Sequence, residues 1–244
     1  GLNSRFTIID QEDQLRLIKN ICKAENIDVK KIAPQFILTF INQWKNKGLL
    51  PKDVVTKKNL PLERAILNVY KFYQERLKIL NSCDFGDLIL LCVSMFENNS
   101  DILELYLNNF KYILVDEYQD TNLTQNALTI LLAQSHGNIC VVGDSDQSIY
   151  QFRGADVRNI LDFEKAFPNT TVVVLDQNYR STQNILDAAN AVISQNIGRE
   201  PKELWTEEGS GTLITKFTAT DETEEAKWVT QQIYHLNRNQ DHPW

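Results

Sequence analysis

The chain has 244 residues, of which 43% are hydrophobic and 23% charged, and this composition excludes a disordered or collagen-like protein. Glycine, with 9 residues, is too scarce for a turn-rich β protein, and no apolar run approaches the ~18 residues that a membrane span requires. The formal charge is −7, yet residues 1–83 carry 15 lysines and arginines against 8 acids, whereas residues 84–244 carry 10 against 24. Such a basic segment is either a solvated helical surface or a surface for a phosphate backbone.

The basic segment is predicted to be entirely helical. Asp10 is a suitable cap for a helix that runs to about Lys23, and Pro34 suits the first turn of a second helix, which Gly48 ends. Pro61 begins a longer third helix, in which apolar residues recur every three or four positions. We expect the basic side chains to lie on the outer faces of these helices.

After Phe85, short apolar runs alternate with predicted helices. The runs at 112–115, 139–142 and 171–175 do not alternate with polar residues, which is typical of strands buried on both faces of a parallel sheet. Helices are expected at 87–96, 101–109, 122–134 (with Asn122 as cap and Gln125 completing a capping box), 156–167, 181–195 and 222–236, and a further strand at 213–217. This order predicts an α/β fold, with a parallel sheet and flanking helices, beside the all-helical segment.

The cysteines indicate a reducing compartment. Cys22, Cys83, Cys92 and Cys140 lie far apart in apolar surroundings and form no CxxC pair, so we interpret them as buried thiols in the cytoplasm. The only methionine is Met95, from which we expect the chain to be an excised piece of a longer protein.

Two acids directly follow the apolar run at 112–115. Asp116 and Glu117 would lie at the carboxyl end of a parallel strand, where α/β sheets bind ligands. Asp116 can hold Mg²⁺, which favours one or two carboxylates together with phosphate oxygens, and Glu117 can deprotonate an attacking water. The alternative is a pair of solvated acids that cap the next helix.

The run at 139–142 leads into a second polar loop. Gln147 has the reach and neutrality to sense a terminal phosphate. Tyr150 and Phe152 lie beside Arg153, and aromatic faces combined with a cation suit single-stranded bases. The alternative buries both aromatic side chains in the core.

A third polar segment follows the run at 171–175. Arg180 precedes a helix whose predicted cap is Ser181, so a guanidinium and free backbone N–H groups would converge on a phosphate oxygen. Tyr179 can stack on a nucleobase. The alternative is a surface ion pair of Arg180 with Asp176 or Asp187.

Three strings, at 116–122, 143–156 and 177–182, resemble motifs II, III and IV of superfamily 1 DNA helicases of the UvrD/Rep/PcrA group in their order and spacing. We call them the first, second and third strings. The resemblance covers essentially the whole chain. It implies a helical 1B-like subdomain at 1–84, the C-terminal half of a RecA-like domain 1A at 85–180 and the beginning of domain 2A at 181–244.

The resemblance also implies roles for matching residues. Asp116 would hold Mg²⁺, and Glu117 would be the catalytic base and reach the same ion through a water. Gln147 would couple the γ-phosphate to DNA. In the third string, Tyr179 would stack on the adenine and Arg180 would contact the γ-phosphate. In the second string, DNA would be contacted by Tyr150, Phe152 and Arg153. The sequence departs from the group at Phe152, where tryptophan is usual, and at Gly86, where an acid is common.

The implied full-length protein is an ATP-dependent, 3′-to-5′ helicase that uses ATP and Mg²⁺. Its partners would be single-stranded and 3′-tailed duplex DNA, together with DNA-repair or replication proteins, and no membrane. None of the nine glycines begins a GxxxxGK[ST] phosphate loop, so we expect the chain alone to be inactive. Two alternatives are a subunit of a RecB/AddA-type helicase–nuclease and a non-catalytic interaction module that retains the helicase fold.

Overall fold

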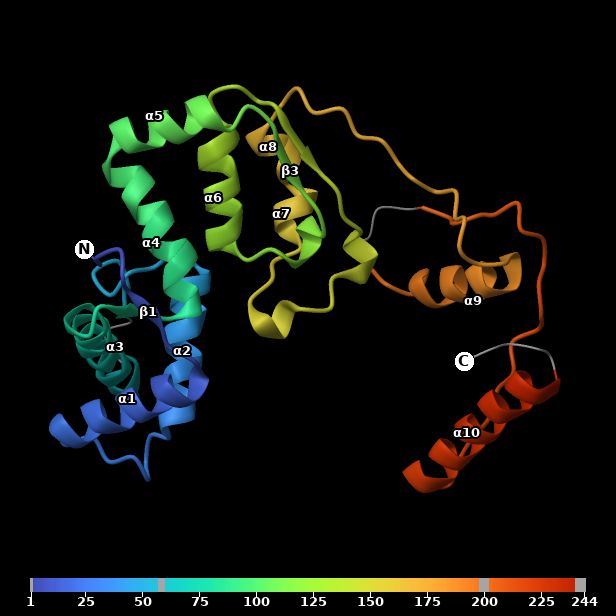
Figure 1. Ribbon diagram of the computed structural model, residues 1–244, viewed down its shortest axis with the longest axis horizontal. Helices are drawn as coiled ribbons and strands as arrows, with labels where there is room; N and C mark the ends of the chain where they lie inside the picture. The colour runs from blue at the N-terminus through green and yellow to red at the C-terminus, as the bar shows by residue number, and fades with distance from the viewer. Residues whose placement is uncertain (1, 57–59, 198–201, 240–244) are drawn as a thin grey trace. The chain divides into compact units, whose positions relative to one another are not determined.

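The computed structural model describes residues 2–56, 60–197 and 202–239. The chain divides into two compact units, residues 1–172 and 173–244, which we describe separately (Figure 1). Among the described residues, the first unit contains helices α1 to α8 and two small parallel sheets, and the second contains α9 and α10.

Three helices form the core at the start of the first unit: α1 (Gln11–Ala24), α2 (Pro34–Asn46) and α3 (Pro61–Ile79) (Figure 1). Their predicted starts are confirmed. The Asp10 carboxylate caps α1 by accepting the N–H of Asp13 at 2.9 Å, and Gly48 follows α2 with a φ of +76°. The buried core residues come from all three helices: Ile18, Ile21, Cys22, Ile37, Leu38, Ile41, Trp44, Ile66, Val69, Tyr70, Tyr73 and Leu77.

Helices α4 (Phe85–Asn98), α5 (Ser100–Asn109) and α6 (Leu123–Ala133) follow, and α2 packs against both α4 and α6. The predicted capping box at the start of α6 is confirmed, because Asn122 and Gln125 each accept the other's backbone N–H at 2.9 Å. A second box begins α4 between Asp84 and Asp87. Strands β1 (Thr7–Ile8) and β2 (Ser82–Cys83) pair in parallel and connect the start of the chain to the end of α3. The expectation that residues 1–83 are entirely helical is therefore wrong, because these two segments form backbone hydrogen bonds with each other, such as Ile9 N–H to the Cys83 carbonyl oxygen at 2.9 Å.

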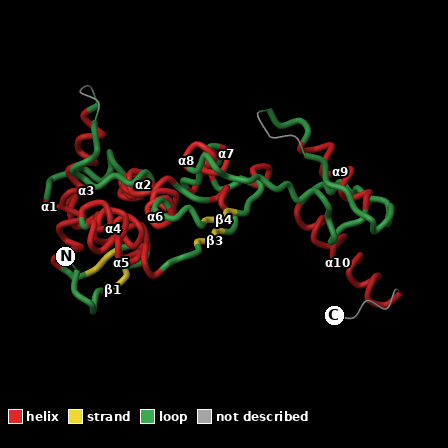
Figure 2. Tube along the Cα trace, turned by 90° about the horizontal axis from the view of Figure 1, so that it is seen from above, coloured by secondary structure: helices red, strands yellow, loops and turns green. Residues whose placement is uncertain are grey.

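Strands β3 (Ile113–Val115) and β4 (Ile139–Val141) form the second parallel pair, with α6 between them along the chain (Figure 2). This β–α–β order confirms the parallel sheet expected here. The expectation that these strands are buried on both faces is wrong, because Leu114 is 78% exposed. Alternate residues of a strand point to opposite faces, and only the face of Ile113 and Val115 is half-buried.

The four cysteines differ in exposure. Cys22 and Cys83 are buried, and burial raises the pKa of both thiols. The expectation of burial is wrong for Cys140, which is exposed in the middle of β4 opposite Leu114, and Cys92 is only half-buried.

Other expected elements differ from the structure. The helix predicted at 156–167 is two short helices, α7 (Arg158–Leu161) and α8 (Phe163–Ala166), because Asp162 leaves helical geometry between them. The segments at 171–175 and 213–217 are not strands. A strand needs a hydrogen-bonded neighbour, and among the described residues outside β1 to β4 only a single bridge forms, between Gln177 and Trp205.

In the second unit, α9 (Gln183–Ile193) and α10 (Glu222–Asn239) confirm the two helices expected there. The residue that caps α9 is Thr182, so the expectation that Ser181 is the cap is wrong. The Phe217 and Trp228 rings stack with centroids 4.7 Å apart. Among the described residues, no helix is both long and apolar enough to cross a membrane.

Candidate functional site

The first string leaves the sheet at β3 through an uncommon backbone conformation. Glu117 has a φ of +50° and ψ of 42°, the left-handed region that a residue with a side chain rarely adopts. Asp116 Oδ1 accepts the N–H of Glu117 at 2.9 Å. Both carboxylates are exposed at the carboxyl end of the strand, where the sequence predicted them.

The chain turns inward directly after these acids. A short 3-10 helix, η1 (Tyr118–Asp120), buries Tyr118 and Gln119. The Gln119 Nε2 donates to Glu117 Oε2 at 2.7 Å, and its Oε1 accepts the N–H of Asp144 at 3.0 Å. The first string is therefore hydrogen-bonded to the second through a buried amide side chain.

The second string begins at Gly143, and close packing requires glycine there. A Cβ at this position would lie 2.5 Å from Gln119 Oε1 and 2.9 Å from Ile160 Cδ1. Gln147 ends a 3-10 helix, η2 (Ser145–Gln147), and its Nε2 donates to Asp144 Oδ2 at 2.9 Å. Glu117 and Gln147 are thus connected by hydrogen bonds through Gln119 and Asp144.

Aromatic side chains and a cation gather further along the second string, around the 3-10 helix η3 (Gln151–Arg153). The Arg153 guanidinium carbon lies 4.8 Å from the Tyr150 ring centroid and 5.3 Å from that of Phe152. Phe152 is 79% exposed and Tyr150 is also exposed, so neither ring is buried in the core. The cluster offers solvent two aromatic rings, tilted by 47° to each other, together with a positive charge.

Asn46, at the end of α2, holds this cluster from the helical side. Its Nδ2 donates to the Arg153 carbonyl oxygen at 3.0 Å, and its Oδ1 accepts Asn122 Nδ2 at 3.1 Å. Gly154, with a φ of +98°, lies against the Asn46 side chain, so a Cβ there would collide with it. Asn46 could not be predicted from the sequence, because an asparagine at a helix end carries no signal of a contact 107 residues away.

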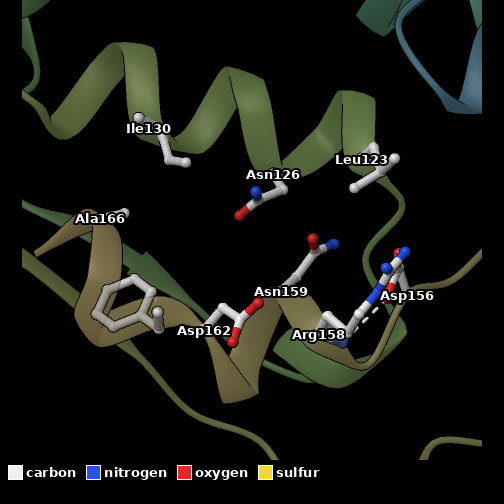
Figure 3. A pocket seen from close by; sticks show the side chains of 9 residues that line it. Leu123, Asn126, Ile130, Asp156, Arg158, Asn159, Asp162 and Ala166 are labelled. Atoms are coloured by element: carbon white, nitrogen blue, oxygen red, sulfur yellow. Dashed lines mark hydrogen bonds and ion pairs between the residues drawn. The ribbon is translucent and has the colours of Figure 1, made fainter.

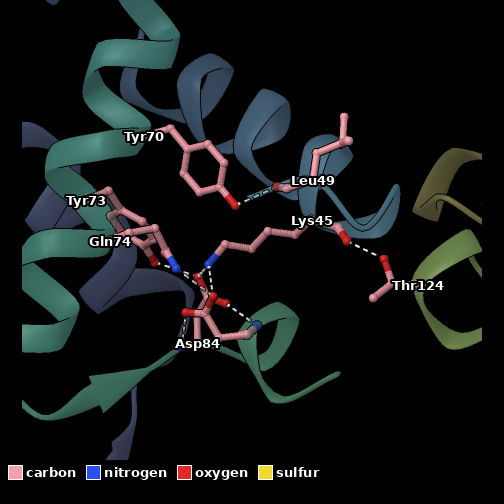
Figure 4. Close-up of polar contacts among 8 residues, drawn as sticks. Lys45, Leu49, Tyr70, Tyr73, Gln74, Asp84 and Thr124 are labelled. Carbon is pink, nitrogen blue, oxygen red and sulfur yellow. Dashed lines mark hydrogen bonds and ion pairs between the residues drawn. The ribbon is translucent and has the colours of Figure 1, made fainter. Parts of the chain in front are cut away.

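A buried charge cluster lies beneath the same helix (Figure 4). Lys45 Nζ lies 2.7 Å from both Asp84 Oδ2 and Asp87 Oδ1, and its side chain is 1% exposed. The expectation that the basic side chains of this segment lie on the outer faces of the helices is wrong for Lys45, because two carboxylates hold it inside. The Tyr73 hydroxyl donates to Asp84 at 2.8 Å, and Gln74 Nε2 donates to Asp87 at 2.9 Å. Burial raises the pKa of Asp87, and the negative charge of Asp84 acts in the same direction. The positive charge of Lys45 opposes this shift but is shared between the two carboxylates.

The packing of this cluster also explains why glycine suits position 86, where the sequence departs from the group it resembles. A Cβ at position 86 would lie 3.0 Å from Lys45 Cδ and 3.4 Å from Asp84 Oδ1. Any side chain there must displace the lysine stem by a few tenths of an ångström. Glycine therefore leaves room for Lys45 to reach both acids.

The third string belongs to the second unit. Asn178 Oδ1 accepts the N–H groups of Arg180 and Ser181, at 2.9 and 2.8 Å, so the backbone donors that we expected to be free are occupied. The Tyr179 ring is exposed, and its hydroxyl donates to Gln177. Within the described residues, Arg180 forms no ion pair with Asp176 or Asp187, and its approach to Glu117 stays a prediction.

A separate cavity of about 300 Å³ lies between α6 and the α7–α8 pair (Figure 3). Asp156 and Arg158 form an ion pair at its edge, and the Arg158 hydrogen bonds lower the pKa of Asp156. None of the site residues predicted from the sequence lines this cavity. Its lining residues are Leu123, Asn126, Ile130, Asp156, Arg158, Asn159, Asp162, Phe163 and Ala166.

The strand-end carboxylates suit the magnesium ion that the sequence implied. Magnesium is held by hard oxygen ligands, commonly one or two carboxylates that complete their shell with phosphate oxygens and waters. Across the described ranges, no group of three or more histidine, cysteine, aspartate or glutamate side chains is arranged to hold a metal. Exposed Asp116 and Glu117 thus fit an ion that arrives with a phosphate ligand better than a closed protein site.

Comparison with known proteins gives the family. The UvrD/REP helicase N-terminal domain matches residues 1–168, and the UvrD-like helicase C-terminal domain matches residues 173–243. These matches follow the two compact units of the structure.

Curated relatives agree with these matches. A "Probable DNA helicase II homolog" from Rickettsia conorii is 49% identical over 239 residues, which are 98% of this chain and 37% of the relative. The "ATP-dependent DNA helicase PcrA" of Staphylococcus epidermidis is 46% identical over 239 residues, covering 98% of this chain and 33% of the relative. The "ATP-dependent DNA helicase PcrA" of Leuconostoc citreum is 47% identical over 236 residues, which are 97% of this chain and 32% of the relative.

The chain spans about a third of the length of these relatives. The match nevertheless extends over nearly all of its own residues, and it includes the acids after β3 and the aromatic loop after β4. The chain belongs to the UvrD/Rep family of DNA helicases.

Proposed function

We propose that this chain is part of an ATP-dependent DNA helicase that moves 3′-to-5′ along single-stranded DNA and unwinds duplex DNA in repair or replication. The observation that carries the proposal is the hydrogen-bonded connection between Glu117 and the loop that exposes Tyr150, Phe152 and Arg153. A motor needs this link, since its hydrolytic group must respond to the nucleic acid. We assign residues 85–180 to a RecA-like domain 1A, 1–84 to a 1B subdomain and 181–244 to domain 2A.

Each polar group in the site has a role in this proposal. Bound MgATP supplies the phosphoanhydride to be cleaved and the cation that offsets its charge. Asp116 holds the ion, Glu117 accepts the proton of the attacking water, and Gln147 contacts the γ-phosphate. In the third string, Arg180 is assigned to γ-phosphate contact and Tyr179 to stacking on the adenine.

The DNA side of the site uses the exposed aromatic cluster. Successive bases stack on Tyr150 and Phe152, while Arg153 adds a cation–π contribution. The basic surface of residues 1–83 attracts the phosphate backbone without regard to sequence. The partners are single-stranded and 3′-tailed duplex DNA and proteins of repair or replication, and the compartment is the cytoplasm.

Substitution of the base tests this function in the full-length protein that contains the chain. Glu117→Gln should lower DNA-stimulated ATP hydrolysis by about a hundredfold or more, because general base catalysis contributes that much. Glu97→Gln, on the exposed surface of α4, is the matched control and should leave the rate unchanged. A wild-type rate in the Glu117→Gln variant would contradict the proposal.

Two further measurements separate the alternatives. A full-length protein that binds DNA without hydrolysing ATP would be a scaffold, and one that degrades DNA in the presence of Mg²⁺ would be a helicase–nuclease subunit. The 244-residue chain alone should hydrolyse no ATP, because none of its glycines begins a phosphate loop. Robust turnover by the purified chain would overturn that expectation.

A further inference from the structure

We propose that Gln119 is a positioning residue that orients the Glu117 carboxylate and couples it to the second string. This inference rests on the proposed function, because it assumes that Glu117 is the base of an ATPase. The side chain is 1% exposed and lies between the two loops that follow β3 and β4. It contacts both of them through opposite ends of one amide group.

The hydrogen-bonding partners of Gln119 require an amide. The Glu117 carboxylate can only accept a hydrogen bond, and the Asp144 N–H can only donate one. A glutamine amide offers a donor to the first, at 2.7 Å, and an acceptor to the second, at 3.0 Å. A carboxylate would supply only the acceptor, and an apolar side chain would supply neither.

Surrounding packing leaves this amide little freedom. The Tyr118 N–H donates to the Val142 carbonyl oxygen at 3.0 Å, which holds the two loops together beside the amide. Gly143 contributes no side chain, and this absence makes room for Gln119 Oε1. On the other side, Glu117 adopts its left-handed conformation, which its neighbours must stabilise.

The contact continues toward the DNA side. Asp144 accepts a hydrogen bond from Gln147, and the second string then leads to Tyr150 and Phe152. A displacement of that loop by a bound strand would move the Asp144 N–H, and the amide that holds Glu117 would move with it. Gln119 is the buried side chain through which this displacement reaches the base.

Two variants separate the two hydrogen bonds. Gln119→Met retains the length of the side chain and removes both bonds, whereas Gln119→Glu retains an acceptor for Asp144 and loses the donor to Glu117. Gln134→Met, at an exposed position after α6, is the matched control.

The first readout needs no nucleotide. In the 244-residue chain, hydrogen exchange at the Asp144 amide should accelerate about tenfold in Gln119→Met, because its acceptor is lost. It should remain near the wild-type rate in Gln119→Glu and Gln134→Met. An unchanged rate in Gln119→Met would overturn the inferred geometry.

The second readout is ATP hydrolysis by the full-length protein, with and without single-stranded DNA. Both Gln119 variants should lower kcat at saturating DNA by about tenfold, with little change in the KM for ATP and a smaller stimulation by DNA. Wild-type kcat and stimulation in Gln119→Glu would overturn the positioning role while leaving the proposed function intact. A wild-type protein without DNA-stimulated hydrolysis would overturn the proposed function, and the positioning role with it.

Discussion

Replacement of Lys45 by methionine should destabilise the first unit severely. Methionine fills a similar volume but removes the charge that faces Asp84 and Asp87, each 2.7 Å from the ammonium nitrogen. Breaking a buried ion pair from one side costs about 3–5 kcal/mol, because the remaining charge is left uncompensated. Here two carboxylates remain, so we expect the upper part of this range and a fall in melting temperature of roughly 10 °C or more.

Circular dichroism during urea and thermal unfolding measures this loss. Lys47→Met is the matched control, since Lys47 is exposed two residues later, and should change the free energy of unfolding by less than about 0.5 kcal/mol. The cost of Lys45→Met should shrink as the pH is lowered, because a protonated carboxyl needs no counter-charge. A second substitution, Asp87→Asn, should recover part of the loss at neutral pH for the same reason.

A loss below about 1 kcal/mol in Lys45→Met, equal at neutral and acidic pH, would refute the reasoning. It would mean that Asp84 and Asp87 do not need the charge of Lys45 in the folded chain. Such a result would also remove the reason given for glycine at position 86, which is the room it leaves for Lys45.

Further predictions concern charge and the DNA surface. Burial raises the pKa of Asp87 in the folded chain, so the contribution of Asp87 to stability is fully present below its unfolded pKa and is lost as the pH rises through its folded pKa. The free energy of unfolding of the wild type minus that of Asp87→Asn should therefore fall as the pH rises. A difference that is independent of pH would contradict this. Phe152→Ala should leave stability nearly unchanged but weaken single-stranded DNA binding by about 1–3 kcal/mol in a fluorescence-anisotropy titration of the full-length protein, whereas wild-type affinity would argue against stacking. Asn46→Ala should cost about 1 kcal/mol of stability and also weaken DNA binding, since it releases the Arg153 carbonyl; a stability loss with unchanged affinity would restrict Asn46 to a structural role.

Features that depend on neighbouring residues were predictable from the sequence. The starts of α1, α2 and α3 depend on Asp10, Pro34 and Pro61, whose effects on the backbone are local. The same holds for the capping box of α6 and for the acids that follow β3. The assignment of chemical roles to those acids needed the resemblance of three strings, because a pair of acids after a strand is by itself a weak signal.

Features that depend on distant partners were not predictable. The apolar run at 171–175 has the composition of a strand, but composition does not supply the neighbour with which a strand must pair. Lys45 contacts acids 39 and 42 residues away, and Gln119 contacts a backbone group 25 residues away, so no short-range pattern marks either residue. A buried lysine in an amphipathic helix is indistinguishable, in sequence, from one that reaches solvent.

The exposed thiol of β4 makes the chain suited to selective chemical labelling. Cys140 is exposed beside Leu114, while the thiols of Cys22 and Cys83 are buried and Cys92 is half-buried. A maleimide reagent should therefore modify Cys140 first. Its reaction rate in the full-length protein would then report whether another polypeptide segment covers that face of the sheet.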